Sequence, residues 1–184
     1  MQAFALSALT VFVGEIGDKT QLLALALACR YRRRLPLAAG ILAATLANHT
    51  LAAWFGVELH SVLNAASLRW VVGLSFLATA AWALRADDPP ADAATARSSQ
   101  GVFWIALISF FLAEIGDKTQ IATALLAARF DALASVVAGT TLGMLLADLP
   151  VVWFGSRVAG LRLGWLRGIA ALLLAALGVV TLLG

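Results

Sequence analysis

The sequence contains few of the residues that a water-soluble protein places on its surface. Only 12% of its 184 residues are charged, whereas 62% are hydrophobic, and the mean hydropathy is +0.93. A soluble domain of this size needs a far more polar surface. The scarcity of charge therefore excludes a soluble globular domain and indicates an integral membrane protein.

Cysteine is almost absent, and the N-terminus lacks a run of basic residues. Cys29 is the only cysteine, so an intrachain disulfide is excluded. A cleaved signal peptide begins with a basic segment, and here the first apolar stretch is also interrupted by Glu15, Asp18 and Lys19. We therefore expect this stretch to be retained as a membrane span.

Six apolar stretches are long enough to cross a bilayer, which takes about 20 residues. They run approximately over 2–28, 36–57, 67–84, 101–128, 132–156 and 164–183. The hydrophilic stretch Arg85–Gln100, which contains two prolines and three aspartates, predicts a linker. We predict an all-α polytopic membrane protein of six transmembrane helices. Its first three-helix repeat covers 1–85, a cytoplasmic linker covers 86–100, and a second three-helix repeat covers 101–184.

One heptapeptide, Glu-Ile-Gly-Asp-Lys-Thr-Gln, occurs twice. It begins at Glu15 and again, 99 residues later, at Glu114, and Gly40 and Gly139 keep the same spacing. The chain is therefore a tandem duplication. With three spans per repeat, the second half enters the membrane from the opposite face, so the repeats are inverted. Inverted repeats are typical of secondary transporters, whose site lies near the midplane between the repeats.

Arginines are distributed unevenly between the two sides of the predicted spans. On one side, the loops after the first, third and fifth spans contain Arg30, Arg32, Arg33, Arg34, Arg85, Arg97, Arg157, Arg162 and Arg167. The other side has only Arg69 and Arg129. Cytoplasmic loops are enriched in Lys and Arg. This bias predicts that the arginine-rich loops are cytoplasmic and both termini outside; the reverse orientation is the alternative.

Each heptapeptide places charge in the middle of a predicted span, where charge is costly and usually functional. On a continuous helix, Glu15 and Asp18 lie at i and i+3 and share one face, which Gln21 extends while Thr20 points elsewhere. Inverted repeats would bring this stripe together with its equivalent in the second copy. The predicted metal ligands are therefore Glu15, Asp18, Gln21, Glu114, Asp117 and Gln120.

An oxygen-rich site of this kind suits a hard divalent cation. Ca²⁺ binds six to eight oxygens, and Mn²⁺ favours octahedral oxygen sites. Gly17 and Gly116 lie within the motifs, where an unwound helix would offer backbone carbonyls as further ligands. We therefore expect Mn²⁺ or Ca²⁺ as the transported substrate, and no cofactor.

Lys19 and Lys118 are the only lysines in the chain, and both lie in the motifs. Four carboxylates and two ammonium groups leave a charge that either one divalent cation or two protons would neutralise. The pattern therefore favours exchange of a divalent cation against protons. Alternatively, each lysine pairs with the glutamate of its own copy at the favourable i,i+4 spacing, Glu15 with Lys19 and Glu114 with Lys118, which does not exclude transport.

A second matched pair of ionisable residues lies within the predicted spans. His49 and Asp148 are 99 residues apart and therefore equivalent in the duplication. Their position indicates a secondary role as ligands or as a proton path. Structural hydrogen bonds to neighbouring helices are the alternative. Asn48 precedes His49 and is a candidate supporting residue.

At these residues the chain resembles the Gdt-type cation/proton exchangers, which include Golgi manganese/calcium transporters and bacterial manganese exporters. The family signature Glu-x-Gly-Asp-(Lys/Arg)-(Thr/Ser) matches twice, and the resemblance covers the whole chain. The matching residues are Glu15, Gly17, Asp18, Lys19, Thr20, Glu114, Gly116, Asp117, Lys118 and Thr119. The resemblance implies Mn²⁺ export from the cytosol, driven by inward proton movement, across a bacterial cytoplasmic (inner) membrane.

Three other functions compete with manganese export. A Ca²⁺/H⁺ exchanger would use the same oxygen ligands, whereas a His49 ligand would favour Mn²⁺. An intramembrane metalloenzyme would activate water with the carboxylates, but the chain lacks a His-x-x-His or His-Glu-x-x-His ligand set. A non-transporting scaffold is disfavoured, because charged residues inside a membrane are costly and such a protein would not use the duplicated charges. The lipid bilayer, protons and a divalent metal ion are the expected partners, and nucleic acid is not.

Overall fold

The protein is all α-helical over residues 1–84, 98–158 and 165–183, which are the residues that its computed structural model describes. These residues form eight helices and no strand, which confirms the predicted all-α class. The helices are α1 (Gln2–Glu15), α2 (Lys19–Arg30), α3 (Arg34–Val62), α4 (Ala65–Ala83), α5 (Ser99–Glu114), α6 (Lys118–Phe130), α7 (Leu133–Val158) and α8 (Trp165–Leu183).

The first and fourth predicted spans are each broken into two helices at the heptapeptide. The stretch 2–28 contains the end of α1 and the start of α2, and 101–128 contains the end of α5 and the start of α6. The bend between α5 and α6 is 71°. The continuous helix on which the shared face of each motif was argued is therefore wrong, whereas the unwinding expected at Gly17 and Gly116 is seen.

Three described helices are individually long and apolar enough to cross a membrane: α3, α7 and residues 65–82 of α4. The bent pair α5–α6 adds a fourth span when its two helices are counted together. Shorter apolar helices cover 2–15 and 171–183. The protein is thus a helical membrane protein with three to four candidate spans among the described residues, and the total of six stays a prediction.

Most of the predicted linker lies outside the described residues, but its end is visible. Ser98 caps α5, since its hydroxyl accepts a hydrogen bond from the Gly101 N–H at 3.0 Å. Such N-caps satisfy a free backbone donor in the first helical turn. Helix α5 therefore begins two residues before the predicted start of the second repeat. The division into two repeats and a linker stays a prediction.

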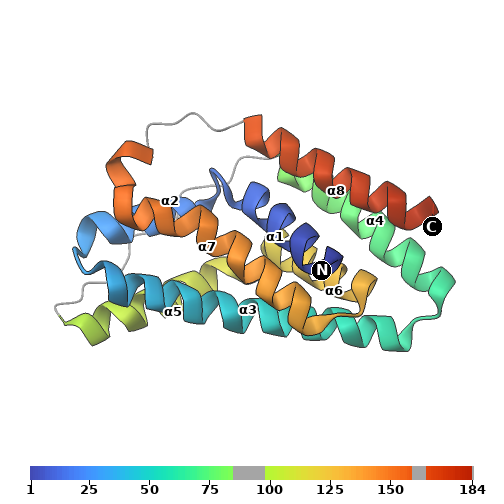
Figure 1. Cartoon of the computed structure of the whole chain (residues 1–184), viewed down its shortest axis with the longest axis horizontal. Helices are drawn as coiled ribbons and strands as arrows, with labels where there is room; N and C mark the ends of the chain where they lie inside the picture. Colours follow the sequence, from blue (N-terminus) through green and yellow to red (C-terminus); the bar gives the residue numbers. More distant parts are fainter. Residues whose placement is uncertain (85–97, 159–164, 184) are drawn as a thin grey trace.

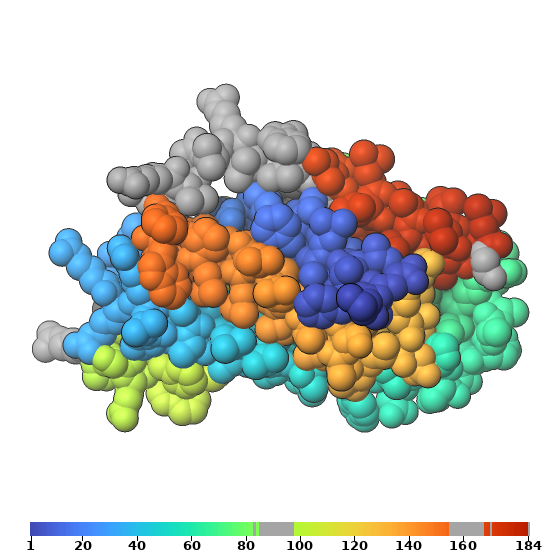
Figure 2. Space-filling model, viewed as in Figure 1, coloured from blue at the N-terminus to red at the C-terminus, as the bar shows by residue number. Residues whose placement is uncertain are grey.

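Equivalent helices of the two halves make reciprocal contacts. Helix α1 packs on α7, and its equivalent α5 packs on α3. Gly139 on α7 closely approaches the backbone at Phe4 in α1, and Gly40 on α3 closely approaches the backbone at Phe103 in α5. A side chain at either glycine would meet these backbones, so glycine allows the contact. On the face shown in Figure 2, α1 lies between α7 and α8, so the halves interleave.

The two broken helix pairs run in opposite directions along the long axis (Figure 1). At one end of the molecule, Arg33 after α2 donates a hydrogen bond to Ser99 at the start of α5. At the other end, a ring nitrogen of His60 near the end of α3 lies 2.6 Å from the carbonyl oxygen of Ala128 near the end of α6. Helices α4 and α8 lie side by side at the edge of this arrangement (Figure 1).

Two buried apolar clusters hold the helices together. One includes Phe76 of α4 and Leu126 of α6, and the other includes Ile41 of α3 and Phe110 of α5. Each of these side chains is fully buried. Lipid is as apolar as these side chains, so close packing and interhelical hydrogen bonds stabilise such contacts more than the removal of water does.

Candidate cation site

Each heptapeptide ends one helix and begins the next, and its own residues cause the break. Helix α1 ends at Glu15 and α5 at Glu114, and the following Gly17 and Gly116 have φ of 80° and 71°. Positive φ is readily adopted by glycine and costs other residues about 1–2 kcal/mol. The helix cannot continue through this conformation, and the chain turns at the glycine.

The aspartate and glutamine of each copy then start the next helix. The Asp18 carboxylate accepts the Lys19 N–H at 2.7 Å as the N-cap of α2, and the Asp117 carboxylate accepts the Thr119 N–H at 3.3 Å as the N-cap of α6. Gln21 accepts the N–H of Gly17 at 2.9 Å through its amide oxygen. This is a variant of the capping box, with a glutamine three residues after the cap.

The second copy repeats this arrangement, since the Gln120 amide oxygen accepts the Gly116 N–H at 2.8 Å. The Asp-Lys-Thr-Gln sequence therefore supplied a signal for a helix start inside the predicted span. The predicted stripe of Glu15, Asp18 and Gln21 on one helix face is wrong because these residues belong to two helices. Gln21 and Gln120 direct their oxygens to the backbone; a role for them as metal ligands stays a prediction.

The lysine of each copy pairs with the aspartate of the other copy. Lys19 Nζ lies 2.8 Å from Asp117 Oδ1, and Lys118 Nζ lies 2.9 Å from Asp18 Oδ2. Both aspartates are buried, and Lys118 is nearly so, whereas Lys19 is 26% exposed. The alternative, in which each lysine pairs with the glutamate four residues before it in the same copy, is wrong for these ion pairs. The helix break between the glutamate and the lysine removes the i,i+4 geometry that such a pair needs.

Three carboxylates from the two copies meet in the interior. One oxygen each of Glu15, Glu114 and Asp117 can be chosen so that all lie within 4.8 Å of one another, and all three residues are buried. Thr20 donates a hydrogen bond to Glu15, and Thr119 donates to Glu114 at 3.3 Å. The expectation that Thr20 points away from the carboxylates is therefore wrong.

The other oxygen of each glutamate has no hydrogen-bond partner among the described residues. Glu15 Oε1 and Glu114 Oε1 are buried without one. Buried charge without a partner is strongly unfavourable, so such oxygens call for a cation or a proton. A divalent cation that binds oxygen ligands matches this donor set. The carboxylates fit a metal ion, and the cross-copy ion pairs place positive charge beside them.

His49 on α3 and Asp148 on α7 are both fully buried, and neither has a hydrogen-bond partner within the described part of the chain. Asp148 is close enough to Glu15 and Glu114 for their charges to repel one another. The structural hydrogen bonds that were the alternative for these residues are not observed in the described ranges. Two unpaired ionisable side chains thus occupy equivalent places in the two halves.

Asn48 connects α3 to the second motif. Its amide group donates to the carbonyl oxygen of Phe111 at 3.1 Å, and its own oxygen accepts from the Gln120 amide at 3.4 Å. In the other half, the Gln21 amide donates to the carbonyl oxygen of Ala147 at 3.0 Å. The Ala147 carbonyl thus holds Gln21 directly, whereas the Phe111 carbonyl holds Asn48, which in turn contacts Gln120. No residue type in the sequence marks these two carbonyls beforehand.

Comparison with known proteins identifies the family of the chain. The family model described as "Divalent cation/proton antiporter GDT1" matches residues 3–90 and again 102–184, so each half matches. A Vibrio cholerae serotype O1 protein named "Putative manganese exporter" is 51% identical, over 93% of this chain and 86% of the relative. A GDT1-like protein of Synechocystis is 34% identical, over 87% of this chain and 86% of the relative. No solved structure matches the chain.

The family model covers both halves and includes both heptapeptides, whose Glu-x-Gly-Asp-Lys-Thr residues carry the resemblance noted in the sequence. Its description and the name of the Vibrio cholerae relative indicate a membrane transporter of divalent cations. The chain belongs to the GDT1 family of divalent cation/proton antiporters.

Proposed function

We propose that this protein exports Mn²⁺ from the cytosol in exchange for protons, at a site formed by the two heptapeptides. One observation carries the proposal: carboxylate oxygens of Glu15, Glu114 and Asp117, which come from both copies, lie within 4.8 Å of one another in the buried interior. The Vibrio cholerae relative, whose name specifies manganese, supports Mn²⁺ as the substrate. Calcium exchange is the alternative within the same chemistry.

The ion pairs leave the glutamates to carry the exchangeable charge. Lys118 neutralises Asp18 and Lys19 neutralises Asp117, so Glu15 and Glu114 remain without a cationic partner among the described residues. One divalent cation between them, or one proton on each, gives the same net charge at the site. Cation and protons therefore compete for the same oxygens, and this competition couples the two fluxes. Asp117 offers a further carboxylate oxygen beside the two glutamates. We assign Gln21 and Gln120 as additional ligands, whose oxygens would exchange their hydrogen bonds with Gly17 and Gly116 for the cation.

The helix breaks give this site its means of reorganisation. Discontinuous helices near the midplane are typical of transporters in which one repeat moves against the other. Here the cross-copy ion pairs connect the break in α1–α2 to the break in α5–α6. Movement of either helix pair would therefore change the surroundings of the carboxylates in both motifs. Alternating access would then expose the same oxygens first to one side of the membrane and then to the other.

We infer that the two halves are inverted repeats of three spans each in a bacterial inner membrane, with both termini outside. The opposite directions of α1–α2 and α5–α6 and the reciprocal contacts of α1 with α7 and of α5 with α3 support this arrangement. The arginine-rich turn between α2 and α3 then faces the cytoplasm.

His49 and Asp148 extend the site asymmetrically. Both are buried and without hydrogen-bond partners in the described ranges, and the charge of Asp148 acts on both glutamates. We assign Asp148 to charge balance during proton exchange. His49 offers a nitrogen ligand, which suits Mn²⁺ better than Ca²⁺.

Flux in proteoliposomes tests the site directly. Glu15→Gln and Glu114→Gln each remove a buried anionic oxygen, and we expect Mn²⁺ transport driven by a pH gradient to fall about 10- to 100-fold. The matched control is Glu58→Gln, since Glu58 is an exposed glutamate of α3 and should be neutral. Wild-type flux in both site variants would sink the site assignment.

A second measurement distinguishes Mn²⁺/H⁺ antiport from the competing functions. When Mn²⁺ is added outside proteoliposomes that contain a fluorescent pH indicator, protons should leave the lumen as the metal enters, and the lumen should become more alkaline. Metal flux without proton movement would exclude antiport. Hydrolytic activity without flux would favour a metalloenzyme, and stronger competition by Ca²⁺ than by Mn²⁺ would favour calcium exchange.

A further inference from the structure

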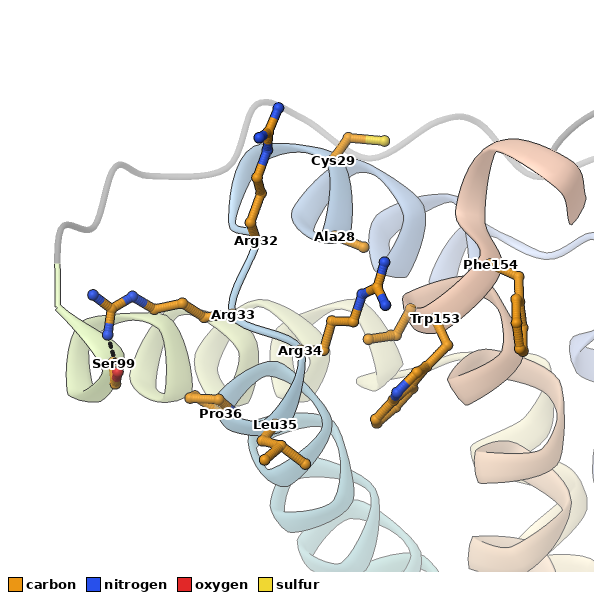
Figure 3. Close-up of a pocket in the computed structure, with 11 residues that line it drawn as sticks. Ala28, Cys29, Arg32, Arg33, Arg34, Leu35, Pro36, Ser99, Trp153 and Phe154 are labelled. Carbon is orange, nitrogen blue, oxygen red and sulfur yellow. Dashed lines mark hydrogen bonds between the residues drawn. The ribbon is translucent and has the colours of Figure 1, made fainter.

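A cavity of about 1120 Å³ lies at the end of the molecule where α2 meets α3 (Figure 3). The turn between these helices forms one wall, and the start of α5 and the last turns of α7 form the others. The lining residues that matter are Arg32, Arg33, Arg34, Ser99, Trp153 and Phe154. No acidic side chain is among the described residues that line it.

Two of the three arginines have no partner in the described part of the chain. Arg33 donates to Ser99, whereas Arg32 and Arg34 take part in no hydrogen bond or ion pair with the described residues. Figure 3 shows Arg34 directed toward α7 and Arg33 directed the other way, toward Ser99. The guanidinium groups at the rim of the cavity therefore have donors available to an anion.

The duplication shows that the fold does not need these arginines. The equivalents of Arg32, Arg33 and Arg34, 99 residues later, are Asp131, Ala132 and Leu133. There the turn is made with Asp131 in the left-handed conformation, at a φ of 46°. The same connection is thus built with an acidic residue in one half and a basic run in the other, so the basic run serves something other than the turn.

The opposite wall of the cavity is aromatic. Trp153 and Phe154 project from α7, and Phe154 is 59% exposed. A guanidinium presents a planar set of donors that matches phosphate oxygens in a bidentate way. Basic pockets between membrane helices bind anionic lipid headgroups. Arginines beside an aromatic wall suit a phosphate that carries hydrocarbon.

We propose, independently of the transport function, that this cavity binds a phosphate group through Arg32 and Arg34, and that an anionic phospholipid headgroup supplies it. The walls come from α2 and α3 in the first half and from α5 and α7 in the second. A bound headgroup therefore holds the two halves together at this end of the molecule.

Native mass spectrometry of the full chain, purified in detergent, tests this. Phosphatidylglycerol should remain bound to the protein, and phosphatidylcholine should not. The double variant Arg32→Gln/Arg34→Gln should weaken phosphatidylglycerol binding at least about tenfold, because two charged hydrogen-bond donors are lost. Arg34→Lys should also weaken it, since lysine keeps the charge but lacks the planar fork. The control is Arg30→Gln, because Arg30 lies beside the Tyr31 ring and does not line the cavity.

Further binding measurements identify whether the phosphate comes from a lipid or from free phosphate. If inorganic phosphate at millimolar concentration binds the wild type and not the double variant, while the lipid does not bind, the ligand is free phosphate. Equal lipid binding by the wild type and the double variant overturns the proposal, as does equal retention of the neutral lipid or binding of neither ligand. Thermal unfolding of each variant confirms that the chain remains folded.

Discussion

The ion pairs between the two motif copies are the side-chain contacts on which the site depends most. Asp18 and Asp117 are each both the N-cap of a half-helix and the partner of a lysine from the opposite copy. Each aspartate thus links the local turn to the distant motif. Removal of one partner of a buried pair is costly, because it leaves a buried charge behind.

A double-mutant cycle distinguishes this pairing from pairing within one copy. We expect Lys19→Met and Asp117→Asn to show a coupling energy of about 1–3 kcal/mol, because their side chains are in contact. Thermal or denaturant unfolding in detergent measures it. The control cycle combines Lys19→Met with Glu15→Gln, and stronger coupling there than with Asp117 would contradict the cross-copy pair.

His49 is the side chain on which metal selectivity should depend. His49→Gln replaces a nitrogen ligand by an oxygen ligand, so we expect Ca²⁺ to compete better against Mn²⁺ flux, by about tenfold. Competition in proteoliposomes measures this ratio. The matched control is His60→Gln, because His60 lies near the end of α3 and contacts the backbone carbonyl of Ala128 near the end of α6, away from the motifs. An unchanged ratio would remove His49 from the site.

Among the helices, the interrupted pairs α1–α2 and α5–α6 decide where charge is placed. A continuous span would carry Glu15 and Lys19 one turn apart, whereas the break turns Lys19 toward the other copy. It also leaves backbone N–H groups at and just before the starts of α2 and α6 without helical partners. The aspartates accept from N–H groups in the first turn of each helix, and the glutamines accept from the N–H groups of the preceding glycines. The broken helices therefore hold polar groups in the interior without leaving their backbone donors unpaired.

Glycine at each break should be required for stability. Gly17→Ala and Gly116→Ala place a side chain at positive φ, and we expect each to lower the free energy of unfolding by about 1–2 kcal/mol. The control is Gly14→Ala, which lies within helix α1, where the added carbon would make an ordinary contact with Thr119. Thermal unfolding in detergent measures all three; equal stability of Gly17→Ala and Gly14→Ala would argue against the break.

For the molecule as a whole, the central question is whether the two halves face opposite sides of the membrane. Cys29 near the end of α2 and Asp131 just after α6 stand at nearly equivalent places in the duplication, and both are exposed. In a parallel duplication they would be on the same side. In the inverted arrangement they are on opposite sides.

Cysteine labelling in intact cells tests this. With an impermeant thiol reagent we expect native Cys29 to be protected, and Asp131→Cys, introduced into a Cys29→Ser background, to be labelled from outside. Ser99→Cys and Ser61→Cys, in the same background, report on the two ends of the bundle independently and should be protected and labelled, respectively. Labelling of Cys29 and Asp131→Cys from the same side would refute inverted repeats.

Much of the site was predictable because the duplication marks it. The heptapeptide, its constant offset and the apolar surroundings predicted that six side chains of the two copies would meet, and carboxylate oxygens of three of these residues, Glu15, Glu114 and Asp117, lie close together. The cap formed by Asp18 and Gln21 was also readable, since an aspartate followed three residues later by glutamine is a helix-start signal. The prediction of a shared face treated each motif as a continuous helix, which hid that signal. The cross-copy partner of each lysine was not predicted; the alternative of pairing within one copy also assumed a continuous helix.

Local chemistry along the chain is sufficient for the all-α class, the duplication and the choice of carboxylates, because hydrophobicity, glycine and capping residues act over a few positions. Contacts between residues far apart in sequence required the tertiary structure. These include the cross-copy ion pairs, the backbone carbonyls of Ala147 and Phe111 that accept from Gln21 and Asn48, and the basic cavity between α3 and α7. Their geometry follows from the packing of opposed helices, which no single stretch of sequence encodes.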